Sequence, residues 1–106
     1  MAQNFVVAKI QKDKVSVFIK PTCPYCSSAK GILNNFKFKP GHLEFIDISS
    51  LAFMDEIQQY FFQTTGERTV PRVYIGDKCI GGCSDLTSLA NSGRLEGILQ
   101  SIGALQ

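Results

Sequence analysis

Tryptophan is absent from this chain of 106 residues, histidine occurs once, and cysteine occurs only four times. Four cysteines are too few for a secreted scaffold built on disulfide bonds, so we expect a reducing compartment, the cytosol, and a chemical role for the thiols. No apolar run approaches the ~20 residues that span a bilayer, and the first residues lack the basic-then-apolar order of a secretory signal. These absences predict a protein that does not associate with membranes.

An excess of one charge is also missing. The chain carries 11 basic and 9 acidic residues, a net charge of +2, and its basic residues form no run of five or more. Such a balance does not favour nucleic acid as a partner. The apolar content of 44% and the charged content of 19% are those of an ordinary globular protein. The length suits one domain over residues 1–106, which we expect to be a monomer.

Periodic patterns of apolar residues predict five helices and four strands. The helices are expected at residues 4–10, 24–36, 49–66, 84–93 and 94–105, and the strands at 14–20, 43–48, 72–76 and 79–82. Ser49 or Ser50 is the expected cap of the third helix. The first two strands are joined through a helix and should pair in parallel, whereas the last two should form an antiparallel hairpin. The predicted fold is an α/β domain with a four-stranded mixed β-sheet flanked by about five helices.

Two cysteines lie three positions apart in the stretch TCPYC, residues 22–26, directly after the first expected strand. Open α/β sheets usually carry their sites at this end of a strand. Cys23 would precede the helix that Pro24 opens, where free N–H groups and the helix dipole favour a thiolate, and Lys20 adds a cation. Cys26 would lie one turn into the helix and be more buried. These positions predict a redox pair, with Cys23 as the attacking nucleophile and Cys26 as the resolving thiol.

The same two cysteines allow other interpretations. They could be structural thiols of the core, or half of a metal site completed by Cys79 and Cys83. The gap between Cys26 and Cys79 is far longer than the usual zinc-ribbon spacing, and Cys79 falls on an expected strand. A Cys-x-x-Cys pair beside a strand–helix–strand pattern in a cytosolic chain is typical of thioredoxin-like redox proteins, which we therefore favour.

Three motifs, in this order and spacing, resemble the glutaredoxin family: CPYC at 23–26, TVPRVYIG at 69–76 and GGCSDL at 81–86. The similarity extends over essentially the whole chain and looks closest to the animal cytosolic dithiol glutaredoxins, or thioltransferases. Thioredoxins usually carry a tryptophan before the motif and a Gly-Pro pair inside it, and this chain has neither. The resemblance implies a thioredoxin-like fold and glutathione as co-substrate, with no metal and no bound nucleotide.

The resemblance also implies a groove for glutathione, with residues 69–71 as one wall. The family has a cis bond before Pro71, which would leave the N–H and C=O of Val70 free to pair with the ligand backbone. The residues alone equally allow an ordinary trans proline at the start of an edge strand. Thr69 belongs to the same wall, and Tyr25 is expected to line the groove and shield the sulfurs.

The second wall is expected where the GGCSD stretch opens a helix. Gly81 and Gly82 permit a close backbone approach. The N–H groups of Cys83, Ser84 and Asp85 suit the γ-glutamyl carboxylate of glutathione. The Asp85 side chain could pair with the ligand ammonium. Helix capping by Ser84 and Asp85 is the plainer interpretation, and it is compatible with ligand binding.

The glycyl carboxylate of glutathione needs cations or amide donors at the opposite rim, and Lys20, Gln58 and Arg68 are the candidates. Arg68 could equally be a solvated loop arginine. Cys79 and Cys83 form an accessory pair, which could close a disulfide under oxidising conditions or stay reduced.

The implied reaction is thiol–disulfide exchange. A monothiol route through Cys23 would reduce protein–glutathione mixed disulfides, and a dithiol route through Cys23 and Cys26 would reduce other disulfides. NADPH would enter only through a separate glutathione reductase, because no Gly-rich dinucleotide fingerprint follows a strand. Ser27 and Ser28 stand where close relatives often carry basic residues, which removes positive charge near the motif. Two other classes stay open: an iron–sulfur carrier, which the stiff Pro24 disfavours, and a non-enzymatic interaction module.

Overall fold

The structure is a computed structural model and describes residues 2–106. In this range the helices are α1 (Ala2–Lys9), α2 (Pro24–Leu33), α3 (Met54–Thr65), α4 (Cys83–Asn91) and α5 (Leu95–Ser101). The strands are β1 (Val15–Ile19), β2 (Leu43–Asp47), β3 (Arg72–Ile75) and β4 (Lys78–Gly81). Each of the nine expected elements is present in the expected order. The α/β class and the mixed sheet are therefore confirmed.

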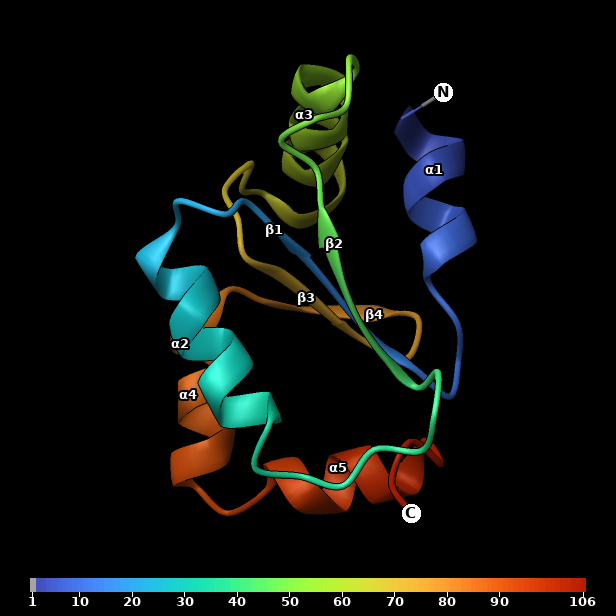
Figure 1. The fold of residues 1–106 in the computed structure, drawn as a ribbon, viewed down its shortest axis with the longest axis vertical. Coiled ribbons are helices and arrows are strands. Elements are labelled where there is room, and N and C mark those ends of the chain that lie inside the picture. The colour runs from blue at the N-terminus through green and yellow to red at the C-terminus, as the bar shows by residue number, and fades with distance from the viewer. Residues whose placement is uncertain (1) are drawn as a thin grey trace.

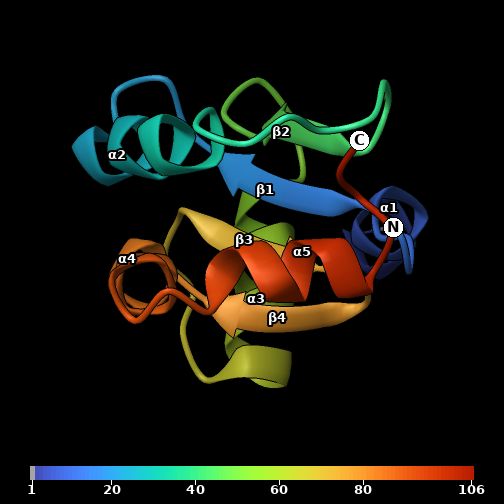
Figure 2. The same cartoon turned by 90° about the horizontal axis from the view of Figure 1, so that it is seen from below.

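The four strands form one sheet in the order β2-β1-β3-β4, and Figure 2 shows them following one another in this order from top to bottom. β1 pairs with β2 in parallel, with Val15 opposite Leu43, because α2 carries the chain back between them. β3 pairs antiparallel with both β1 and β4, and a bulge between Val73 and Tyr74 shifts the register toward β4. The parallel unit and the closing hairpin were both predicted correctly.

Helices cover both faces of the sheet (Figure 1): α1 and α3 lie on one side, and α2, α4 and α5 on the other. The central strand β1 is buried along its whole length, so it serves two cores at once. Its residues Val15, Val17 and Ile19 pack toward α2, α4 and α5. Phe18 points the opposite way, where its ring lies 5.3 Å from that of Phe61 and 5.8 Å from that of Tyr74. Both faces of β1 are therefore buried, and its one polar residue, Ser16, donates its hydroxyl to the Lys9 carbonyl at 2.6 Å.

The start of α3 was predicted wrongly. The helix begins at Met54, and neither Ser49 nor Ser50 caps it. The Asp47 carboxylate instead accepts the backbone N–H of Ser49 at 2.8 Å and its hydroxyl at 2.7 Å. This local pairing holds the chain in a turn after β2 and delays the helix.

Smaller differences occur elsewhere. β4 begins at Lys78 rather than at residue 79, and α4 begins at Cys83 rather than at residue 84. Within residues 2–106, no helix is both long and apolar enough to pass through a lipid bilayer.

Candidate active site

The two cysteines of the CPYC motif lie at the amino end of α2, as the sequence predicts. Cys23 is the residue that precedes the helix, and its Sγ accepts the backbone N–H of Cys26 at 3.2 Å. Its side chain is half-buried, whereas Cys26 is 2% exposed. The helix end thus offers a hydrogen-bond donor and a partial positive charge to one sulfur and buries the other.

Burial raises the pKa of the Cys26 thiol to about 12, and a hydrogen bond with Cys23 adds to this shift. A thiol with such a pKa stays protonated at neutral pH. Cys26 is therefore a poor nucleophile toward molecules in solution, and the sulfur next to it is that of Cys23.

A groove of about 420 Å³ opens beside the cysteine motif. Its lining residues are Tyr25, Glu67, Thr69, Val70, Pro71, Arg72, Gly82, Cys83, Ser84 and Asp85. Eight of the eleven residues predicted to hold glutathione, Tyr25 among them, thus lie together on one surface, which we call the groove. The Val70–Pro71 bond is cis, as the resemblance implied. The Val70 carbonyl is not free, however, because it accepts the thiol of Cys23 at 3.7 Å.

The helix start at the far side of the groove is closely packed. Gly82 precedes α4, and its N–H donates to the Asp85 carboxylate at 3.0 Å. Gly81 has a φ of +118°, and a Cβ atom added there would lie 2.1 Å from the same carboxylate oxygen. One oxygen of Asp85 therefore caps the helix, which leaves the other for a ligand ammonium. Both interpretations of this residue are compatible with the geometry.

The other three predicted ligand residues form a chain of hydrogen bonds outside the groove lining. The Lys20 ammonium donates to the Gln58 side-chain oxygen at 3.4 Å, and the Gln58 amide donates to the backbone carbonyl of Arg68 at 3.1 Å. The Lys20 carbonyl also accepts the N–H of Cys23 at 3.3 Å. Gln58 is buried and so orients the Lys20 ammonium, whereas the Arg68 side chain is exposed.

Sequence reasoning missed two residues of the groove, Glu67 and Arg72. Arg72 opens β3 and is 3% exposed, although it carries a charge. Its guanidinium donates to the Thr65 hydroxyl and to the Glu67 carboxylate, both at 3.3 Å. A charged residue amid the apolar positions of a buried strand was the available signal.

Comparison with known proteins decides the family. A family profile named Glutaredoxin matches residues 15–80. Glutaredoxin-1 of Homo sapiens is 60% identical over 106 residues and is matched over the whole of both chains. The chain belongs to the glutaredoxin family. It is accordingly an oxidoreductase of the glutaredoxin type, and its fold is thioredoxin-like.

Solved structures agree with this family assignment. A buckwheat glutaredoxin–glutathione complex superposes with a TM-score of 0.90 at 32% identity, over 100% of this chain and 94% of that one. Oxidized glutaredoxin 2 from Chlamydomonas reinhardtii superposes with a TM-score of 0.87 at 38% identity, over 98% and 95% of the two chains.

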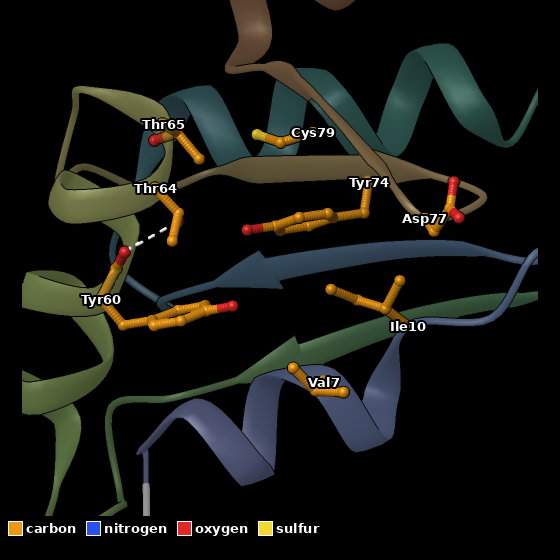
Figure 3. Close-up of a pocket in the computed structure, with 8 residues that line it drawn as sticks. All are labelled: Val7, Ile10, Tyr60, Thr64, Thr65, Tyr74, Asp77 and Cys79. Atoms are coloured by element: carbon orange, nitrogen blue, oxygen red, sulfur yellow. Dashed lines mark hydrogen bonds between the residues drawn. The ribbon is translucent and has the colours of Figure 1, made fainter.

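A second hollow of this glutaredoxin, about 370 Å³, lies between α1, α3 and the β3–β4 hairpin. Figure 3 shows Tyr60 and Tyr74 on its walls, together with Cys79. Cys79 is a free thiol there, and burial raises its pKa. All four cysteines are reduced in this structure, so a disulfide between Cys79 and Cys83 stays a prediction. Among residues 2–106, no group of three or more His, Cys, Asp or Glu side chains could hold a metal ion.

Proposed function

We propose that this glutaredoxin reduces protein–glutathione mixed disulfides through Cys23 alone, and other disulfides through Cys23 and Cys26 together. The asymmetry of the two sulfurs carries this proposal. Cys23 is half-buried and accepts an N–H bond at the start of α2, whereas Cys26 is 2% exposed with a raised pKa. One thiol is thus available to a substrate, and the second is available only to the first.

In the monothiol route, the Cys23 thiolate attacks the glutathione sulfur of the mixed disulfide. The bond between the two substrate sulfurs breaks, the protein leaves as a thiolate that takes up a proton, and glutathione remains on Cys23. The thiolate of a second glutathione then attacks the glutathione sulfur that is bound to Cys23. This step releases Cys23 as a thiolate and forms glutathione disulfide. One free glutathione is consumed: together with the glutathionyl group of the substrate it ends as glutathione disulfide, and the protein sulfur ends as a thiol.

In the dithiol route, Cys23 first forms a disulfide with one substrate sulfur. Cys26 then loses its proton and attacks Cys23, which releases the substrate as a dithiol and leaves Cys23 and Cys26 oxidised. The spacing of three residues within one helical turn supports this closure. Two glutathione molecules restore the reduced pair.

The residues around the groove support glutathione as the bound ligand. The amide groups of Cys83, Ser84 and Asp85 open α4 and suit the γ-glutamyl carboxylate. Thr69 and Val70 line the opposite wall, where the Val70 N–H, rather than its occupied carbonyl, would pair with the ligand backbone. The glycyl carboxylate would meet Lys20, whose ammonium Gln58 orients.

We further propose a cytosolic monomer whose partners are glutathione and proteins with glutathionylated or disulfide-bonded cysteines. A separate glutathione reductase would reduce the glutathione disulfide back to glutathione with electrons from NADPH. The small number of cysteines, four in 106 residues, supports the reducing compartment. Glutathione acts as a co-substrate in this scheme, and no step uses a metal.

Substitution of single sulfurs tests the two routes. Cys26→Ser should keep the reduction of a glutathionylated peptide and lose the reduction of an intramolecular protein disulfide, measured in a coupled glutathione–glutathione reductase assay. Cys23→Ser should lose both activities. Cys79→Ser serves as the matched control and should keep both. Activity that persists in Cys23→Ser would remove the nucleophile assignment.

A further inference from the structure

Arg72 is a buried cation that the exchange chemistry does not use. It is 3% exposed and lies directly after the cis proline, at the edge of the groove. Its Nη1 donates to Thr65 at 3.3 Å, its Nη2 to Glu67 at 3.3 Å, and its Nε to the Pro71 carbonyl at 3.4 Å. Removing a guanidinium from water costs free energy, and these three hydrogen bonds compensate for part of that cost.

The charges of the groove lining connect Arg72 with the binding of a charged ligand. Among the lining residues described, Arg72 is the one cation, whereas Glu67 and Asp85 are both carboxylates. Glutathione carries two carboxylates and one ammonium at neutral pH and is therefore an anion. Without Arg72, two negative side chains would face a negative ligand, which disfavours binding.

Arg72 also lies against the backbone that would receive the ligand carboxylate. A Cβ atom placed on Gly82 would come within 3.0 Å of the Arg72 Nη2 atom and 3.3 Å of the Pro71 carbonyl oxygen. Gly82 immediately precedes α4, whose first N–H groups form the proposed carboxylate site. The guanidinium thus lies next to the residue that precedes that site, and its charge has the same sign as the amino end of the helix dipole.

We infer that Arg72, paired with Glu67 and packed against Gly82, is the positioning residue that makes the groove selective for an anionic thiol over a neutral one. This inference rests on the proposed glutathione chemistry and deepens it. Arg72 does not touch the sulfurs; it acts by neutralising Glu67 and by holding the wall at residues 65–67 against the start of α4. The remaining negative charge, on Asp85, is then left to pair with the ligand ammonium.

The test measures selectivity in a single transfer. Every variant is built on Cys26→Ser, so that the reaction stops once Cys23 has accepted the small thiol. Two substrates are compared by stopped-flow: one peptide capped with glutathione, and the same peptide capped with the neutral thiol 2-mercaptoethanol. Arg72→Gln should lower the rate constant for the glutathionyl peptide by about 10-fold, since a charged interaction that orients the ligand is lost. The rate constant for the neutral peptide should change by less than about twofold.

Two further variants separate charge from packing. Adding Glu67→Gln to Arg72→Gln should restore the glutathionyl rate by about threefold, because the uncompensated carboxylate is removed. Arg72→Lys keeps the positive charge without the bidentate donor geometry of arginine. Its rate constant for the glutathionyl peptide should lie between those of the parent and Arg72→Gln. It also keeps the test informative if Arg72→Gln fails to fold. Arg94→Lys, which alters an exposed arginine that contacts Ser92, is the control and should match the parent.

The outcomes distinguish a failure of this inference from a failure of the proposed function on which it rests. If both peptides slow equally in Arg72→Gln and in Arg72→Lys, Arg72 is only structural and the inference is wrong. If Glu67→Gln restores nothing, its neutralising role is wrong. If the parent protein itself shows no preference for the glutathionyl peptide, the proposed function fails, whatever the variants do.

Discussion

Gly81 offers a sharp test of the packing at the groove. Its φ of +118° lies in a region that favours glycine, and an added Cβ would lie 2.1 Å from one Asp85 oxygen and 2.6 Å from the carboxylate carbon. Gly81→Ala must therefore strain the backbone, at about 1–3 kcal/mol. It must also displace the carboxylate that accepts the Gly82 N–H, which costs about 1 kcal/mol as the loss of a cap.

Together these effects predict a loss of about 2–4 kcal/mol in the free energy of unfolding. For a chain of this size, the midpoint of thermal unfolding should fall by roughly 10–20 °C. Calorimetry or circular dichroism measures this directly. The rate of glutathione-linked turnover should fall as well, because the displaced Asp85 can no longer meet the ligand ammonium.

The control is the same substitution at Gly97, within α5. Apart from its chain neighbours and the backbone of its own helix, no atom lies within 4 Å of the Cβ position there, and its φ is not in the left-handed region. Gly97→Ala should instead stabilise the protein by about 0.5–1 kcal/mol, since alanine loses less backbone entropy in a helix. If Gly81→Ala unfolds within about 3 °C of the parent, a smaller shift than a loss of about 1 kcal/mol would cause, or if both variants change stability alike, the reasoning is refuted.

Three further predictions concern the core, the surface and the buried thiol. Phe61→Ala should destabilise the protein by about 3–5 kcal/mol in denaturant unfolding, because it opens a cavity beneath the sheet, and Phe61→Leu should cost less. The Lys14 ammonium lowers the pKa of the Glu44 carboxyl from its usual 4.5, so this stabilisation exists at pH values above 4.5 and is lost as the pH falls through the lowered pKa. The unfolding midpoints of the parent and Glu44→Gln should accordingly differ at neutral pH and converge at strongly acidic pH; a constant difference would contradict the pairing. Iodoacetamide should label Cys23 in the native protein and leave Cys26 unmodified until denaturant is added, as read by mass spectrometry, because Cys26 is 2% exposed with a raised pKa.

Local sequence signals predicted the elements well where one strong preference governed the chain. Pro24 opens α2 and Gly66 ends α3 with a φ of +86°, as their backbone preferences require. The prediction failed at Ser49, where two local preferences competed. A serine can cap a helix or can close a turn with a preceding aspartate. Here the two hydrogen bonds from Ser49 to Asp47 stabilise the turn.

The sequence by itself determined the place of the cysteine pair at the start of α2, the parallel β1–β2 unit and the motif pattern of a glutaredoxin. These depend on short-range effects, such as the proline after Cys23 and the apolar run of β1, which neighbouring residues settle. Only the tertiary structure revealed that Arg72 is buried, that it holds Glu67, and that it lies against Gly82. Those contacts join Arg72 to residues five and ten positions away along the chain, and a buried charge is tolerated only where packing brings its partners together. The charge balance of the groove is therefore a property of the folded protein, which residue spacing could not show.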